Sequence, residues 1–327
     1  MEEKDEEKYL GDLISKDGRN LKNIKARVNK GKGIAQKILN ILDGIPFGKL
    51  YFQVATLLRN SLLVSSLLCN SEAWFNVTNA ELELLESVDL MLLRSIMKAP
   101  KSTPKEMLFL ELGILPLREI IRERRLNFVH YILNQEANSL IVKVFEKQVK
   151  NSTAKDWVNT VIDDLEKVGL NATFAEIKTT RKVKWKNMVK KSISEHAFSN
   201  LEKIKQSHSK VKELKHEKLN IQTYFLPNKL DISKEDIQNI FRMRCQVVNL
   251  KMNMKGIYDE YECKVCEEEN ETQEHIYECR EIWKMRKKEQ IKNPSYEKIM
   301  NGSIKEKLEV SRIFKENMTI HEKYKAE

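Results

Sequence analysis

Apolar residues recur at helical spacing along most of the chain. From Leu21 to Ile41 they fall three or four residues apart with lysines between them, as on one amphipathic helix. The next stretch, Pro46 to Leu67, is apolar on all sides, which indicates a buried helix. Gly31 and Gly33 are expected to bend or interrupt the first helix. The pattern predicts a mainly α protein.

Local signals mark the ends of these elements. Thr78 and Glu81 have the spacing of a capping box, which pairs free backbone N–H groups at a helix start. Gly113 is placed to end a helix in the left-handed conformation, and Gly169 to end another. Before residue 20 the pattern changes, and a short β-hairpin with a turn at Asp17-Gly18 is expected.

After residue 135 the helical pattern of apolar residues becomes weaker and the sequence more polar, so we place a domain boundary there. The predicted parts are a hairpin at 1–20, a helical bundle at 21–135, a linker with one helix at 136–180, a basic helical connector at 181–255, a small metal-binding finger at 256–290 and a charged helical tail at 291–327.

Composition narrows the class of protein. With 327 residues, 41% of them hydrophobic, the chain can bury a sizeable core, and only 10 glycines and 6 prolines argue against an all-β fold. The acidic start and the lack of a long apolar run predict no secretory signal and no membrane span. We expect a soluble intracellular protein, nuclear or cytoplasmic, in a reducing compartment.

Net charge points to a polyanionic partner. The chain carries +10, and residues 181–220 hold twelve Lys or Arg against four Glu. Lysines attract phosphates and release counterions, which favours RNA or DNA; the alternative is an ordinary solvated helix face. Trp185 could stack on a base or lie in the core. The nucleic-acid-binding candidates are Lys22, Lys25, Lys30, Lys32, Lys182, Lys184, Lys186, Lys190 and Lys191.

A cluster of Cys and His predicts one structural zinc ion. Cys263, Cys266, His275 and Cys279 supply three thiolates and one imidazole, a set that fills a tetrahedral site and leaves no open position. The alternative is a chance group of free thiols. Between residues 260 and 278 the chain has eight Glu and one Lys, so the finger is expected to act as a clasp and not as a phosphate reader.

No catalytic site is evident from the sequence. Asp163-Asp164 is the paired carboxylate motif, but its helical context indicates a solvated helix face and not a two-metal site. The histidines lack a nucleophile in a recognisable context. We therefore expect no enzymatic activity.

Several short motifs, in their order along the chain, resemble the C-terminal part of non-LTR (LINE-type) retrotransposon reverse transcriptases. They are Tyr9-Leu10-Gly11, Leu84-Leu85-Glu86-x2-Asp89, Leu110-Glu111-Leu112-Gly113, Arg124-Arg125-Leu126-x-Phe128, Tyr224, Phe241-Arg242-x-Arg244, Asn253-x-Lys255-Gly256 and Thr272-Gln273-Glu274-His275 with its cysteines. The resemblance implies the end of a palm, a thumb at 21–135, a connector and a terminal CCHC zinc finger.

The resemblance also implies what this chain lacks. The family's catalytic palm belongs before Tyr9, where only eight residues stand, and 48 residues after Cys279 are too few for an endonuclease. Three hypotheses follow: a non-catalytic part that grips a template-primer of RNA or DNA, a helical zinc adaptor that binds a protein, or a polymerase part completed in trans by a palm-bearing subunit.

Overall fold

A computed structural model describes residues 6–9, 12–16, 19–48, 50–151, 156–226, 232–254, 257–286 and 294–324. These residues form a mainly helical structure with one short antiparallel hairpin, which confirms the predicted class. The elements are β1 (Glu6–Tyr9), β2 (Asp12–Ser15), α1 (Leu21–Asp43), α2 (Tyr51–Leu58), α3 (Ser65–Leu67), α4 (Asn79–Met97), α5 (Lys105–Leu112), α6 (Leu117–Leu133), α7 (Leu140–Lys150), α8 (Trp157–Lys167), α9 (Phe174–Thr179), α10 (Lys182–Gln206), α11 (Lys234–Arg244), α12 (Gln273–Glu278), α13 (Arg280–Met285), α14 (Lys298–Asn301) and α15 (Ile304–Tyr324).

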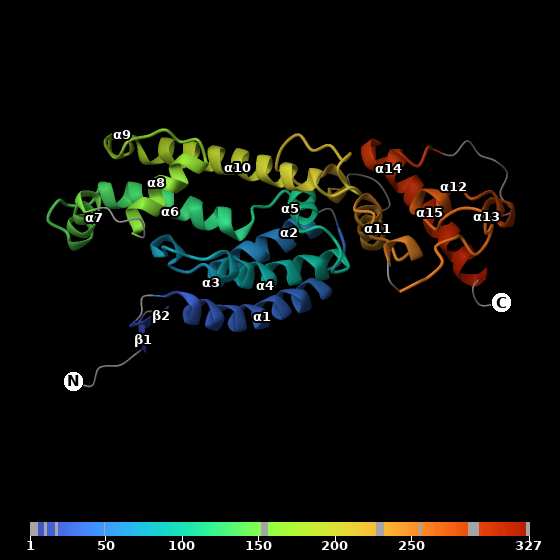
Figure 1. The fold of residues 1–327 in the computed structure, drawn as a ribbon, viewed down its shortest axis with the longest axis horizontal. Helices are drawn as coiled ribbons and strands as arrows, with labels where there is room; N and C mark the ends of the chain where they lie inside the picture. Colours follow the sequence, from blue (N-terminus) through green and yellow to red (C-terminus); the bar gives the residue numbers. More distant parts are fainter. Residues whose placement is uncertain are drawn as a thin grey trace.

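The molecule is elongated, with a helical bundle at one end and the C-terminal helices at the other (Figure 1). None of the described helices combines the length and apolar character needed to cross a bilayer.

The turn of the hairpin lies closer to the N-terminus than the sequence predicts. Tyr9 pairs with Asp12 and Glu6 with Ser15, so the two strands are connected ahead of the expected Asp17-Gly18 turn. Residues 10, 11, 17 and 18 lie outside the described part of the chain. The hairpin packs beside the start of α1, and β2 contacts that helix.

Helix α1 runs without a break through both glycines, so the predicted interruption is wrong. Its buried face packs along α4 and against α3. A Cβ atom on Gly31 would lie 2.7 Å from Leu67 Cδ2, so this glycine allows α1 and α3 to approach closely. Tertiary packing thus outweighs the low helix propensity of glycine.

A buried ion pair joins the residue after α2 to α4 inside the bundle. Arg59 Nε donates to Asp89 Oδ1 over 2.7 Å, and Arg59 Nη2 also donates to the carbonyl of Leu115 over 3.1 Å. Both charged side chains are buried. Because each charge has a partner, the pair fixes the relative position of the helices without leaving an unsatisfied charge in the core.

The described residues of 136–180, which leave out 152–155, form the helices α7, α8 and α9, so the predicted linker with one helix is wrong. They pack with the end of α6 and the start of α10 around a second core that contains Phe145, Trp157, Ile177 and Trp185. The polar sequence in this part covers the outer faces of short helices, which is why its apolar pattern is sparse.

The predicted basic connector at 181–255 is not one element. Helix α10 lies along α6 and α5, with Val189 and Ile193 in the second core and Leu201 in the main core. The segment after it is irregular, yet Val211 and Phe225 pack into the main core. These residues are held in the body of the protein because their apolar side chains are buried there.

The predicted charged tail is an integral part of the fold. Helix α15 packs against α11, α12, α13 and α14, and Val310 and Phe314 on its inner face are buried. The main core runs without interruption from the bundle into these C-terminal helices. The charges of the tail lie on the other face of α15, as expected for an amphipathic helix.

Glu111 is the centre of a buried polar cluster between the bundle and the C-terminal part. It accepts hydrogen bonds from Tyr224 Oη (2.6 Å), Arg244 Nη2 (2.8 Å) and His216 Nε2 (2.9 Å). Burial alone would raise the pKa of Glu111, but Arg244 and His216 hold it well below its ordinary range. Arg244 Nη1 also donates to the carbonyl of Ile299 over 3.2 Å, which extends the cluster to α14.

Candidate metal centre and basic surfaces

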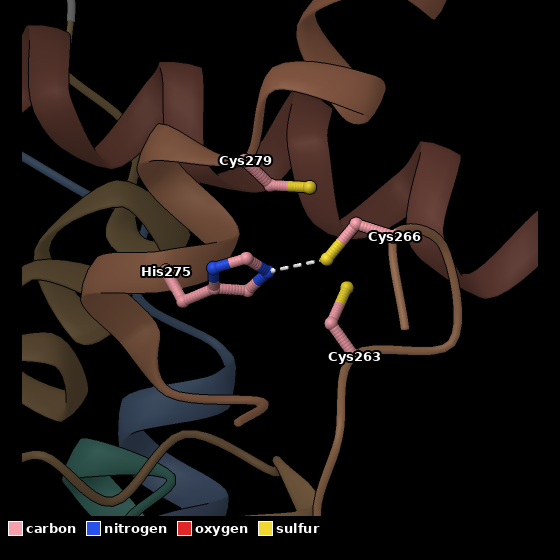
Figure 2. A group of neighbouring side chains, drawn as sticks. All are labelled: Cys263, Cys266, His275 and Cys279. Atoms are coloured by element: carbon pink, nitrogen blue, oxygen red, sulfur yellow. Dashed lines mark hydrogen bonds between the residues drawn. The ribbon is translucent and has the colours of Figure 1, made fainter. Parts of the chain in front are cut away.

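The four predicted ligands meet at one point in the C-terminal part. Their donor atoms all lie within 4.8 Å of one another, and Cys266 Sγ is 3.3 Å from His275 Nε2 (Figure 2). Cys263 and Cys266 come from a loop, His275 from α12, and Cys279 from the junction of α12 and α13. These residues could hold one metal ion.

Short local contacts give the loop and helix this geometry. Cys263 N–H donates to the carbonyl of Glu269 over 2.7 Å, and Glu267, in the left-handed region with φ 58°, donates to the carbonyl of Cys263. Thr272 caps α12 by accepting a hydrogen bond from His275 N–H over 3.0 Å. The four-residue spacing of His275 and Cys279 then places both side chains on one side of this short helix.

A carboxylate orients the imidazole. Glu269 Oε2 lies 3.2 Å from His275 Nδ1, on the opposite side of the ring from the thiols. If Nδ1 carries the proton, it donates to Glu269, and Nε2 presents its lone pair to a metal. Sequence reasoning missed this role, because nothing in the pattern distinguishes Glu269 from the other seven glutamates of the segment.

The thiols need a cation beside them to ionise together. Burial, with a smaller effect from the neighbouring Cys279 and Cys266, raises the pKa of Cys263 to about 12, although backbone hydrogen bonds lower it. Burial also raises the pKa of Cys279. A bound divalent ion would reverse this effect, since a metal deprotonates the thiols that coordinate it.

The finger does not stand apart from the rest of the protein. Cys263, Ile276 and Cys279 belong to the main core, and Asn317 Nδ2 of α15 donates to the carbonyl of Ile276 over 3.0 Å. The expectation of a separate small finger is therefore wrong. A metal here would fix one edge of a larger packed structure.

The five predicted lysines of α10 are all exposed, but they do not share one face of the helix. Lys184 and Lys191 lie on the side away from the buried residues, whereas the other three lie beside the buried stripe, each three residues before one of its members. Lys205, near the end of the same helix, is buried instead and donates to Glu202 Oε1 over 2.9 Å. Trp185 is buried, and its Nε1 donates to the carbonyl of Leu126 over 2.9 Å. It is a core residue and cannot stack on a base.

The lysines of α1 are exposed as well, but they lie on another side of the molecule. In Figure 1, α1 runs along one edge of the bundle and α10 along the opposite edge, with α4 and α6 between them. The structure does not bring Lys22, Lys25, Lys30 and Lys32 together with the lysines of α10. The predicted basic residues thus form two surfaces.

The paired aspartates have different environments. Asp163 is exposed, as expected, whereas Asp164 is buried and accepts hydrogen bonds from Arg122 Nε (2.8 Å) and Arg125 Nη1. Asp164 therefore joins α8 to α6. The interpretation of the pair as a solvated helix face holds only for its first residue.

The metal-binding segment presents negative charge to solvent. Seven of its eight glutamates are exposed, and Glu271 is buried. Burial, followed by repulsion from Glu274, Glu269 and Glu297, raises the pKa of Glu278. This field opposes the approach of phosphate groups to the face that carries the glutamates.

Comparison with known proteins assigns no family. No protein-family model, no curated protein and no solved structure matches the chain. The resemblance to non-LTR reverse transcriptases stays a prediction from short motifs.

Proposed function

We propose that this protein binds RNA or DNA without catalysing a reaction on it, and that the exposed lysines of α10 are its main contact. One observation carries the proposal. Five exposed lysines lie on the first turns of a helix that is held in a core: Lys182, Lys184, Lys186, Lys190 and Lys191. Cations gathered on a packed helix neutralise the phosphates of a strand with no dependence on base sequence.

Zinc is the metal that the four-residue site suits best. Three soft thiolates and one imidazole favour Zn²⁺ over Mg²⁺ or Ca²⁺, and four protein ligands complete a tetrahedron. The role would be structural, with Cys263, Cys266, His275 and Cys279 as ligands. Elemental analysis of protein purified without added metal should find about one zinc per chain. A folded, metal-free protein would contradict this assignment.

The resemblance to non-LTR reverse transcriptases suggests which nucleic acid is bound and in what role. As the thumb and connector of a non-LTR reverse transcriptase, these helices would grip the template-primer. Glu111, Tyr224 and Arg244, from three separate motifs of the resemblance, meet in one buried cluster. Contact between residues of separate motifs is expected if the motifs hold the fold together, and it supports the proposed thumb and connector.

Charge reversal tests the main contact. We expect Glu at all five lysines of α10 to weaken binding of a labelled single strand and to flatten the dependence of affinity on salt, because fewer counterions are released. The matched control reverses five exposed lysines elsewhere: Lys37, Lys101, Lys143, Lys147 and Lys150. Equal loss in both variants would show only a net-charge effect and would contradict a specific role for α10.

A protein adaptor is the second candidate, and the exposed glutamates of the metal-binding segment favour it. A basic protein partner would contact this segment instead of α10. Replacing Glu267 and Glu268 by Gln should then weaken partner binding, whereas nucleic-acid binding should stay the same or increase. The two functions therefore respond to different variants.

A further inference from the structure

A basic pocket lies on the α1 side of the bundle, away from α10 and from the metal ligands. It has a volume of 560 Å³ and lies between the hairpin, α1 and the end of α3. Pockets of about 300–1,000 Å³ hold small molecules. The residues that matter for its chemistry are Lys8, Asn23, Arg27, Lys30, Ser66 and Cys69.

A polar network fixes one wall of this pocket. Arg27 pairs with Asp12, donates from Nε to Asn23 Oδ1 over 3.2 Å, and donates from Nη1 to the carbonyl of Ser66 over 3.0 Å. Burial opposes ionisation of Asp12, but hydrogen bonds from Asn70, Arg27 and Asn23 lower its pKa. The guanidinium is therefore held in place by a charged partner before any ligand arrives.

Lys8 and Lys30, the other two cations of the pocket, are not paired with a described carboxylate as Arg27 is. Neither Lys8 nor Lys30 has an ion-pair partner within the part of the chain that the structure describes, and both are exposed. No described lining residue carries a carboxylate. Ser66 Oγ is buried and makes no hydrogen bond to any described group. Two lysines and a fixed arginine around a hydroxyl suit an oxyanion.

We infer that this pocket binds the phosphate group of a nucleotide, either free or within a strand. Lys8 and Lys30 would contact the phosphate oxygens, and the volume leaves room for the attached sugar. The inference does not rest on the lysines of α10, since those lie on the opposite edge of the bundle (Figure 1). It adds a second site, with a defined shape, to the exposed lysines of α10.

Cys69 provides a reporter inside the pocket. It is the exposed cysteine of the five; Cys245 is buried, and the other three are the predicted metal ligands. Alkylation of Cys69 in the zinc-loaded full chain can be followed by mass spectrometry. A bound ligand should slow it in proportion to occupancy, about tenfold when the ligand is at ten times its dissociation constant.

Three probes identify the source of the phosphate. Inorganic phosphate, uridine monophosphate and a ten-residue oligothymidylate are titrated separately against the alkylation rate. Protection by the monophosphate at concentrations where the oligomer has no effect assigns a free nucleotide; stronger protection by the oligomer assigns a strand. Absence of protection by all three probes overturns the inference. This result leaves the α10 proposal intact if the oligomer still binds the chain.

Matched variants separate the pocket from general charge. Lys8→Gln with Lys30→Gln should raise the concentration needed for half-protection about tenfold, because two charge-assisted contacts are lost. Lys143→Gln with Lys147→Gln removes the same charge from exposed positions of α7, outside the pocket, and should leave protection unchanged. Equal effects of the two double variants would also overturn the inference.

Discussion

At the scale of single residues, two adjacent aspartates differ in what surrounds them. Asp164 is buried between Arg122 and Arg125, whereas Asp163 faces solvent. We expect Asp164→Ala to lower the free energy of unfolding by about 3–5 kcal/mol, because it leaves two guanidinium groups buried without that partner. Asp163→Ala should change it by less than about 0.5 kcal/mol. Urea unfolding measures both, and similar losses would contradict the assigned contacts.

Glu269 and Glu268 form a second pair with different predicted effects. Glu269 contacts His275 Nδ1, although its side chain is 72% exposed. Glu269→Gln should weaken zinc binding about tenfold, the low end for a residue that orients a ligand. Glu268→Gln should leave the zinc affinity unchanged. Competition with a chromophoric chelator gives both affinities, and an unaltered value for Glu269→Gln would remove this residue from the metal site.

At the scale of elements, two glycines end helices with the same backbone conformation in different surroundings. Gly113, with φ +63°, follows α5, and a Cβ atom there would lie 2.0 Å from the backbone nitrogen of Ile221. Gly169, with φ +69°, follows α8, and a Cβ atom there would meet no described atom within 4 Å. Both glycines end their helices as predicted, and the left-handed conformation predicted for Gly113 is present.

The two glycines should therefore respond differently to alanine. Gly169→Ala should cost about 1 kcal/mol, the penalty of a left-handed alanine. Gly113→Ala adds a clash with backbone that cannot move aside, so about 3–5 kcal/mol is expected. Thermal unfolding of the two variants checks the difference. Equal values would show that residues 220 and 221 do not pack tightly on α5.

At the scale of the whole molecule, the Glu111 cluster connects the bundle to the C-terminal helices. Its folded-state pKa lies below that of an unfolded glutamate, about 4.3, so its stabilising effect is complete above that value and is lost as the pH falls below it. The folded protein should therefore lose stability as the pH falls from about pH 5 to about pH 3 and below, in part through this residue.

Glu111→Gln tests the cluster. At neutral pH it should lower the free energy of unfolding by about 3–5 kcal/mol, because Arg244 stays buried without its carboxylate. The further loss between about pH 5 and about pH 3 should be smaller than in the wild-type protein. The same acid dependence in both proteins, measured by urea unfolding, would show that Glu111 does not set it.

The sequence by itself determined the features that depend on neighbours along the chain. Helical spacing predicted the α class, the capping box at Thr78 is present, and Gly113 ends its helix as expected. The metal ligands could be found because paired cysteines and an i, i+4 His-Cys spacing are local patterns.

Only the tertiary structure decided the features that depend on which faces meet. Packing of α7, α8 and α9 against α6 turned a predicted linker into a second core and buried Asp164 and Trp185. The fold also placed α1 and α10 on opposite edges and brought Glu111 to Arg244, 133 residues away. Such contacts arise from burial of apolar surface between distant segments, and local spacing carries no record of the partner.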